Sequence, residues 1–110
     1  MTHYIVVATC PDIKTAQALA SILVQARLAA CVNIIPAIRS IYEWEGKIEN
    51  EEESLLLIKS REDHYPALEQ AIVKHHPYEV PEILALPIEK GLPAYLGWLD
   101  AVLEKKEGKQ

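Results

Sequence analysis

The stretch that decides the fold runs from Ala30 to Ser60 and reads ACVNIIPAIRSIYEWEGKIENEEESLLLIKS. Residues 30–44 are rich in β-branched and aromatic side chains, and residues 47–59 contain the apolar run LLLI, so both segments are typical of β-strands. The pair Glu45-Gly46 lies between them, and glycine readily adopts the positive φ angles of tight turns. The stretch therefore predicts a β-hairpin with two long arms.

The two arms are too long for the domain that carries them. At about 3.3 Å per residue, an arm of about fourteen residues spans roughly 45 Å, whereas a compact chain of this size has a radius of gyration of about 13 Å. The end of the ribbon must therefore extend beyond the domain with open sheet edges and uncovered apolar side chains. We expect these side chains to pack against other copies of the chain. The expected interface residues are Ile38, Ile41, Tyr42, Trp44 and Ile48.

Composition indicates one globular domain, residues 1–110. Of the 110 residues, 50% are hydrophobic and 25% are charged, which is ordinary for such a domain. A net charge of -5 and a pI of about 5.3 do not suit the phosphate backbone of nucleic acids. The sequence contains neither an apolar run long enough to span a membrane nor a secretory signal. We therefore expect a cytoplasmic protein that binds neither nucleic acid nor membranes.

The rest of the chain predicts an α+β fold. A nearly continuous apolar run at residues 3–9 indicates a central strand, and apolar residues at helical spacing follow from Ile13 to about Arg27. The elements expected after the hairpin are a helix that begins near Tyr65 and ends before Pro77, a strand at 82–88, a C-terminal helix opened by Gly91 and Pro93, and a flexible charged tail at 104–110. The order β-α-β-β-α-β predicts a ferredoxin-like sandwich with a long hairpin between its second and third strands and helices on one face of an antiparallel sheet. The expected strand order is four-one-three-two.

Three segments should converge at one edge of this sheet: the end of the first strand, the loop HHPYEVPE, and the root of the hairpin overhang. His75 and His76 stand out there, because imidazole binds copper and zinc, and Cys10 would add a thiolate. The alternative is structural, since a helix C-terminus favours histidine through its dipole and neighbouring helical side chains point about 100° apart. Spacing alone favours this alternative. His3 and His64 are expected to be solvated.

The two cysteines, Cys10 and Cys31, are expected to be reduced. They do not form the dense set typical of a small secreted disulfide scaffold. In the predicted topology they lie at opposite ends of the sheet, which also argues against a bridge between them. Either can serve as a small apolar side chain of the core.

Acidic and aromatic side chains offer further candidates for binding. The acidic residues of segment 49–53 could attract cations, although a solvated run that protects the sheet edge is favoured. Glu82 and Tyr78 lie in the converging corner, and Trp44 and Trp98 are typical of packing or interface anchors. The sequence has no Walker-type phosphate loop, no G-x-S-x-G and no CxxC motif. We therefore do not expect an enzyme.

Five stretches taken together point to one family: RLAACVNIIP, SIYEWEGKIE, LLLIKS, HHPYEVPEILALPIEKG and YLGWL. Over about residues 4–103 the chain resembles the CutA family, the divalent-cation tolerance proteins. The resemblance implies a ferredoxin-like homotrimer, similar in architecture to the PII signalling proteins, in which the hairpins of three subunits interlock. It also implies a role in tolerance to copper and other divalent metals.

The resemblance further implies a copper site at a cysteine near the end of the first strand and at the histidines before Pro-Tyr. The histidines match as His75 and His76, whereas the cysteine position falls on Ala8. Cys10 lies two residues later on the same face of the strand and is our candidate replacement. We therefore predict a homotrimer that binds divalent cations, copper first, at His75, His76 and Cys10.

Two alternatives remain open. One is a PII-like signalling trimer whose inter-subunit clefts bind a small anionic or nucleotide-like effector. Its candidate lining residues are Lys59, Tyr78, Glu82 and Trp98. The other is a structural or interaction trimer in which the corner residues only pack. Binding measurements with small metabolites would separate the first alternative from the metal-binding prediction.

Overall fold

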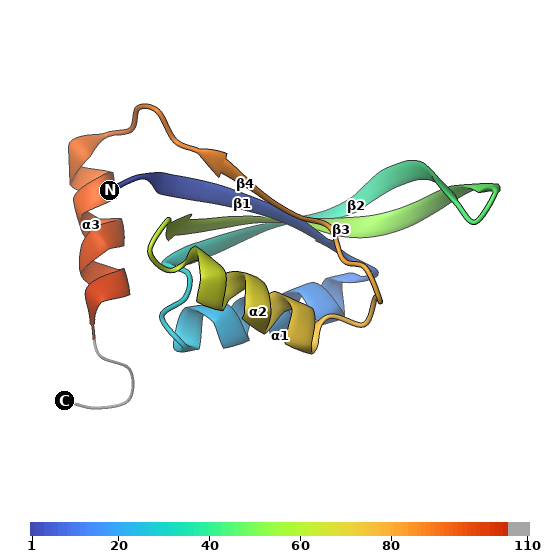
Figure 1. Ribbon diagram of the computed structural model, residues 1–110, viewed down its shortest axis with the longest axis horizontal. Helices are drawn as coiled ribbons and strands as arrows, with labels where there is room; N and C mark the ends of the chain where they lie inside the picture. Colours follow the sequence, from blue (N-terminus) through green and yellow to red (C-terminus); the bar gives the residue numbers. More distant parts are fainter. Residues whose placement is uncertain (106–110) are drawn as a thin grey trace.

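The computed structural model describes residues 1–105, which form a four-stranded antiparallel sheet and three helices (Figure 1). The elements are β1 (His3–Cys10), α1 (Ile13–Gln25), β2 (Cys31–Trp44), β3 (Lys47–Arg61), α2 (Tyr65–His75), β4 (Ile83–Pro87) and α3 (Pro93–Glu104). The strand order is β2-β3-β1-β4, so the predicted ferredoxin-like α+β fold is confirmed. A flexible tail was predicted at residues 104–110. Glu104 is instead the last residue of α3, and residues 106–110 lie outside the described part of the chain. No helix within residues 1–105 is long and apolar enough to cross a bilayer.

Local signals explain where α1 begins and ends. Asp12 is its N-cap, and the Asp12 carboxylate accepts a 2.7 Å hydrogen bond from the backbone N–H of Thr15. The helix ends at Gln25, two residues before the predicted boundary, because Arg27 adopts a φ of 60° that a right-handed helix cannot contain. The chain then turns directly into β2.

The main core lies between the sheet and the two helices α1 and α2, which cover one face (Figure 1). Alternation along β1 turns Val6, Ala8 and Cys10 towards these helices, and all three are fully buried. The helices contribute Leu19 and Leu23 from α1 and Leu68 and Ile72 from α2. Ala8 and Cys10 therefore lie on the same strand face, as predicted, and this face is the core.

The hairpin formed by β2 and β3 extends beyond the rest of the domain (Figure 1). It turns at Glu45 and Gly46, whose φ angles are 51° and 83°, and the molecule is 48 Å long against 31 Å and 22 Å in the other directions. The ladder is interrupted between Ile35 and Ile38, where Ala37 adopts a φ of 63°. The predicted overhang is confirmed. Its exposed apolar side chains include Ile41 (68%), Ile48 (72%), Trp44 (46%) and Tyr42 (39%).

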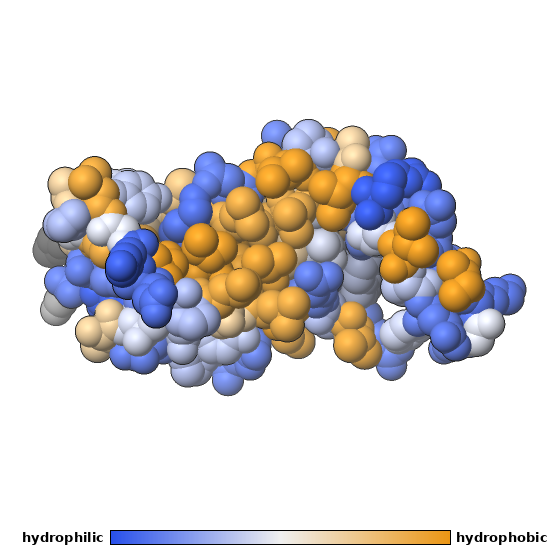
Figure 2. Space-filling model, turned by 90° about the horizontal axis from the view of Figure 1, so that it is seen from above, coloured by the Kyte–Doolittle hydropathy of each residue, from blue (hydrophilic) through white to orange (hydrophobic). Residues whose placement is uncertain are grey.

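The sheet face opposite α1 and α2, here called the outer face, is also apolar. Alternation and strand register place seven side chains on it: Ile5, Val7, Ile35, Leu55, Leu57, Leu84 and Leu86. Figure 2 views the molecule from this side and shows a broad hydrophobic patch across the sheet. Leu84 and Leu86 are about half exposed, at 56% and 49%. An apolar sheet face of this extent without a cover is typical of an interface.

Helix α3 is held at the end of the sheet by a small apolar contact and by ion pairs. The apolar contact is formed by Leu99, Leu103 and Ala30. Arg61, at the end of β3, is only 6% exposed, and its guanidinium lies 3.0 Å from both Asp100 and Glu104 of α3. The same guanidinium forms a bidentate salt bridge with Asp63, in which Nε and Nη2 donate hydrogen bonds of 2.7 and 2.8 Å to the two carboxylate oxygens. We call Arg61 and these three carboxylates the Arg61 network.

Two histidines extend this network. The Nε2 atom of His3 lies 2.8 Å from the Asp100 carboxylate, and the Nδ1 atom of His64 lies 3.0 Å from that of Asp63. The Nε2 atom of His64 also lies 3.2 Å from the carbonyl oxygen of Leu103. The prediction that both histidines are solvated was wrong, because two of their partners come from α3, far along the chain.

Candidate functional site

The predicted convergence at one edge of the sheet is present, and His76 is at its centre. The His76 side chain follows α2 and is almost buried, with 8% exposed. Its Nε2 atom lies 2.7 Å from the carbonyl oxygen of Thr9 at the end of β1, and its Nδ1 atom accepts a 3.1 Å hydrogen bond from the N–H of Tyr78. These contacts assign the proton to Nε2. Both ring nitrogens of His76 are therefore used inside the protein.

Cys10 lies at the same corner but faces the core. Its side chain is fully buried, and this burial, together with the charges of Asp12 and Glu53, raises the pKa of the Cys10 thiol to about 11. His75, the last residue of α2, is exposed. Within residues 1–105, no three His, Cys, Asp or Glu side chains form a group that could hold a metal ion. Cys10, His75 and His76 are thus near one another in the fold without forming a preassembled set of ligands.

The burial of Cys10 predicts slow chemical modification. We expect iodoacetamide at pH 8 to leave Cys10 of the folded protein unmodified under conditions that alkylate a free thiol, because a pKa of about 11 leaves roughly a hundredfold less thiolate than an ordinary pKa near 9. Mass spectrometry of the peptides measures the modification. Unfolding in guanidinium is the control and should restore rapid reaction. Rapid alkylation of the native protein at Cys10 would contradict the buried placement.

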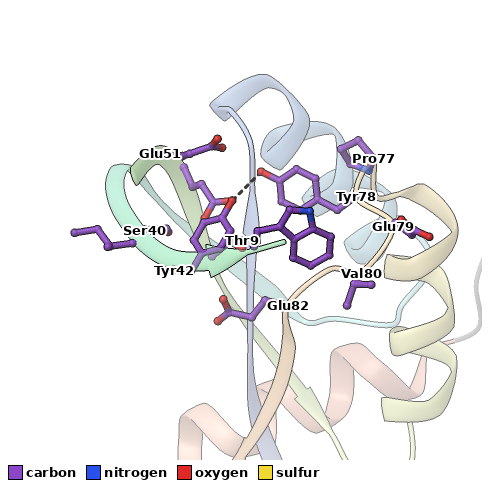
Figure 3. Close-up of a pocket in the computed structure, with 12 residues that line it drawn as sticks. Thr9, Ser40, Tyr42, Glu51, Pro77, Tyr78, Glu79, Val80 and Glu82 are labelled. Atoms are coloured by element: carbon purple, nitrogen blue, oxygen red, sulfur yellow. Dashed lines mark hydrogen bonds between the residues drawn. The ribbon is translucent and has the colours of Figure 1, made fainter. Parts of the chain in front are cut away.

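A cavity of about 710 Å³ lies between the hairpin and the loop after α2, and we call it the hairpin cavity (Figure 3). Its lining residues are Thr9 of β1; Ser40, Ile41, Tyr42 and Trp44 of β2; Glu51 and Glu53 of β3; and Pro77, Tyr78, Glu79, Val80 and Glu82 of the loop. The volume is in the range of small-molecule sites in proteins. The sequence can bring these side chains together because alternate residues of the paired arms share one face.

The hairpin cavity has an acidic and aromatic wall. Glu53 is only 5% exposed, and its carboxylate accepts a 2.8 Å hydrogen bond from the hydroxyl of Tyr78 (Figure 3). Burial and this contact with Glu53 raise the pKa of Tyr78 well above its usual range. The pKa of Tyr42 is also raised, by desolvation and then by the charges of Glu51 and Glu53. The carboxylates therefore produce a negative potential inside the cavity.

Only half of the predicted cleft lining belongs to this cavity. Tyr78 and Glu82 line it, whereas Lys59 and Trp98 do not. The Lys59 amine donates a hydrogen bond to the side chain of Asn33, at the other end of the hairpin arms. Trp98 lies on α3, is 47% exposed and packs against a neighbouring tyrosine of the helix. One protomer does not bring these four residues together.

From the sequence we placed the root of the hairpin overhang at this corner but assigned none of the hairpin side chains to a binding site. Trp44 and Tyr42 were predicted as interface residues, and Glu53 was predicted as part of a solvated acidic run. The alternation of side chains along each arm could have indicated that these residues share one face. In the pairing of β2 with β3, Glu51 lies opposite Ser40. The same alternation separates Glu51 and Glu53 from Glu52, which lies 4.0 Å from Arg39.

Comparisons with known proteins agree with one another. Residues 4–102 match the model of the family described as CutA1 divalent ion tolerance protein. The chain is 52% identical over 96 residues to Protein CutA of Mus musculus, an alignment that covers 87% of this chain and 54% of the mouse protein, so the chain spans about half the length of that relative.

Two solved structures extend this agreement to the fold. CutA1 from Oryza sativa has a TM-score of 0.92 at 40% identity, covering 96% of this chain and 97% of the rice chain. The periplasmic divalent cation tolerance protein CutA from Archaeoglobus fulgidus has a TM-score of 0.90 at 38% identity, covering 93% and 99%. Because the family model matches residues 4–102, almost the whole of this chain, the chain belongs to the CutA1 divalent ion tolerance family.

Proposed function

We propose that this protein is a homotrimer of the cytoplasm that binds divalent metal ions, copper first, and takes part in the response to them. It acts as a binding protein and not as an enzyme. The observation that carries the metal-binding part is membership of the divalent ion tolerance family. The sequence resemblance described above supports the choice of copper and of three subunits.

The uncovered apolar surface supports assembly. The outer face of the sheet and the overhanging hairpin both expose large apolar side chains in a single protomer, as Leu84 and Ile41 illustrate. Burying them against further copies removes this surface from water, at about 25 cal/mol per Å² of apolar area. Threefold packing would bring the hairpin of each subunit onto its neighbours.

Metal would bind weakly, because the protein must release internal contacts to receive it. His75 is exposed and serves as the first ligand. His76 can follow through Nδ1 if it gives up the N–H of Tyr78. Cys10 would have to leave the core and lose its proton, so its contribution comes last. Imidazole nitrogens suit Cu²⁺, which supports the preference for copper.

We expect a His75→Ala/His76→Ala double variant to lose at least about tenfold in copper affinity, since imidazole ligands dominate binding at neutral pH. Calorimetric titration with Cu²⁺ measures the change. The matched control is Lys74→Ala, which removes a neighbouring exposed side chain of α2 that cannot serve as a neutral ligand at this pH. Identical titrations of the wild type and the double variant would exclude this site.

A second candidate function is binding of a small effector, and the hairpin cavity favours it. In this second function the protein is a PII-like signalling trimer, and binding of the effector is the signal. The negative wall around Glu53 disfavours an anionic or nucleotide-like effector in this cavity. Lys59 and Trp98 could join Tyr78 and Glu82 only across a subunit boundary.

A further inference from the structure

We propose that His64 is a pH-sensitive tether for α3. The protonated His64 ring holds the C-terminal end of α3 against the domain, and loss of the proton releases that end. This inference goes beyond the proposed function, because it involves neither the candidate metal ligands nor the hairpin. It depends on the two oxygen atoms that the ring nitrogens of His64 face.

Both nitrogens of the His64 ring face hydrogen-bond acceptors. The Nδ1 atom lies 3.0 Å from a carboxylate oxygen of Asp63, and the Nε2 atom lies 3.2 Å from the backbone carbonyl oxygen of Leu103. A neutral imidazole has one N–H and can donate only one of these bonds, whereas the imidazolium ion donates both. The neutral ring must also turn a lone pair towards one of the two oxygens. The contacts of His64 are therefore complete only in the protonated state.

His76 shows the opposite arrangement. One of its ring nitrogens faces the carbonyl oxygen of Thr9, and the other accepts a hydrogen bond from the N–H of Tyr78. A neutral ring satisfies both of these partners. The two histidines therefore differ in the number of protons that their contacts require.

The charges around His64 also favour a cation. Asp63, its carboxylate partner, belongs to the Arg61 network, which has three carboxylates and one guanidinium and is therefore negative overall. His3 of β1 adjoins this network through Asp100 of α3. The remaining titratable groups beside these residues are exposed and form no ion pair among residues 1–105; they are Glu62 and Lys105.

Leu103 is the residue through which the tether acts on α3. Its side chain is 3% exposed and packs with Ala30 and Leu99. Its carbonyl group belongs to the last turn of α3, where carbonyls have no partner within the helix and attract positive charge. The start of α3 has no side-chain cap, and Figure 1 shows the helix standing apart from α1 and α2. The bond from His64 therefore secures a helix that has few other contacts.

The direction of the pH effect follows from the charge of the ring. The imidazolium ion stabilises the position of α3, and the pKa of histidine in an unfolded chain is about 6.5. The stabilisation is therefore present at about pH 5.5 and is lost as the pH rises towards about 8.5. Asp63 stays ionised over this range, because hydrogen bonds from Arg61 lower its pKa.

Hydrogen exchange of the full chain, read by mass spectrometry, tests the proposal. The measured quantity is the protection factor of α3, which corrects the exchange rate for its intrinsic dependence on pH. We expect α3 to be at least about threefold more protected at about pH 5.5 than at about pH 8.5, whereas α1 should show no such change. EDTA in both buffers keeps the test independent of the proposed metal binding. Equal protection of α3 at both pH values, or the same change in α1, would overturn the proposal.

Two replacements of His64 separate the tether from its pH dependence. A glutamine side chain offers an N–H donor at every pH, so His64→Gln should give α3 the same protection at both pH values. His64→Leu has no donor, and it should lower the protection of α3 at about pH 5.5 by at least about threefold. The His64 side chain forms no capping bond at the start of α2, so neither replacement removes a helix cap.

His3→Gln is the matched control. Among residues 1–105 the His3 ring has one described partner, the carboxylate of Asp100, which lies 2.8 Å from Nε2. A neutral His3 ring can still donate this bond, so the variant should keep the pH dependence of the wild type. If the pH dependence persists in His64→Gln, or disappears in His3→Gln, the titrating group is not His64 and the proposal fails.

Discussion

Replacing Leu84 by aspartate is expected to convert the proposed trimer into monomers. Leu84 lies on the outer face of β4 next to Val7 of β1, and it is 56% exposed in the protomer. In a lone subunit a carboxylate at this position is tolerated, because it stays hydrated. Against the apolar face of another copy it would lose its hydration without gaining a partner, which destabilises the interface. Sedimentation velocity at micromolar concentration measures the change in mass.

The matched control for this variant is Val73→Asp. Val73 is an aliphatic residue with a similar exposed fraction, 53%, but it lies on α2, away from the outer face. We expect this variant to sediment as the wild type does. If both aspartate variants keep the wild-type sedimentation coefficient, the outer face is not the surface through which the subunits assemble.

Replacing Arg61 by methionine is expected to lower the free energy of unfolding by roughly 2 kcal/mol. Breaking a fully buried ion pair by removing one partner costs about 3–5 kcal/mol. We expect a loss below that range, because the side chains of Asp63 and Asp100 are 36% and 38% exposed and water screens their charges. Helix α3, which has few apolar contacts, should loosen first. Urea unfolding measures the loss. Arg39→Met, at an exposed hairpin arginine, is the control and should change stability by less than about 0.5 kcal/mol.

The same variant should change the pH dependence of stability. Hydrogen bonds from Arg61 lower the pKa of Asp63, and hydrogen bonds from His3 and then Arg61 lower the pKa of Asp100. A carboxylate whose pKa is lower in the folded state stabilises the protein above its unfolded pKa, about 3.9, and this contribution is lost as the pH falls through the folded pKa. The wild type should therefore lose stability below about pH 4 more steeply than Arg61→Met. Parallel profiles would show that the network contributes no net stability.

The fold was largely predictable because its signals are local and repeated. The hairpin turn at Glu45-Gly46 and the apolar periods each depend on neighbours within a few residues, and both predictions are confirmed. The outer face also left a signal. The run Leu55-Leu56-Leu57-Ile58 is apolar at every position, and a strand needs such a run only when both faces of its sheet are covered.

The site was less predictable because it depends on side-chain directions and distant partners. The sequence predicted that Cys10 and His76 lie at the same corner. It did not predict that Cys10 faces the core, or that the His76 ring forms hydrogen bonds with the backbone of Thr9 and Tyr78. The period of two had already placed Cys10 on the same face as Ala8, and a core position for one implies a core position for the other. The buried contact between Glu53 and Tyr78 joins residues 25 positions apart, so no local pattern indicates it.

The N-terminal end of the chain lies beside α3, the last described helix. His3 of β1 and Arg61 of β3 share the carboxylate of Asp100, and the backbone N–H of Thr2 donates a 3.0 Å hydrogen bond to Glu62. Figure 1 shows the N-terminus beside α3, at the end of the sheet opposite the hairpin tip. The first strand is thus anchored to the last described helix by a contact between residues 97 positions apart in the sequence, at the end of the sheet away from the ribbon. Fluorescent or affinity tags attached at residue 1 would likewise sit far from the tip of the hairpin.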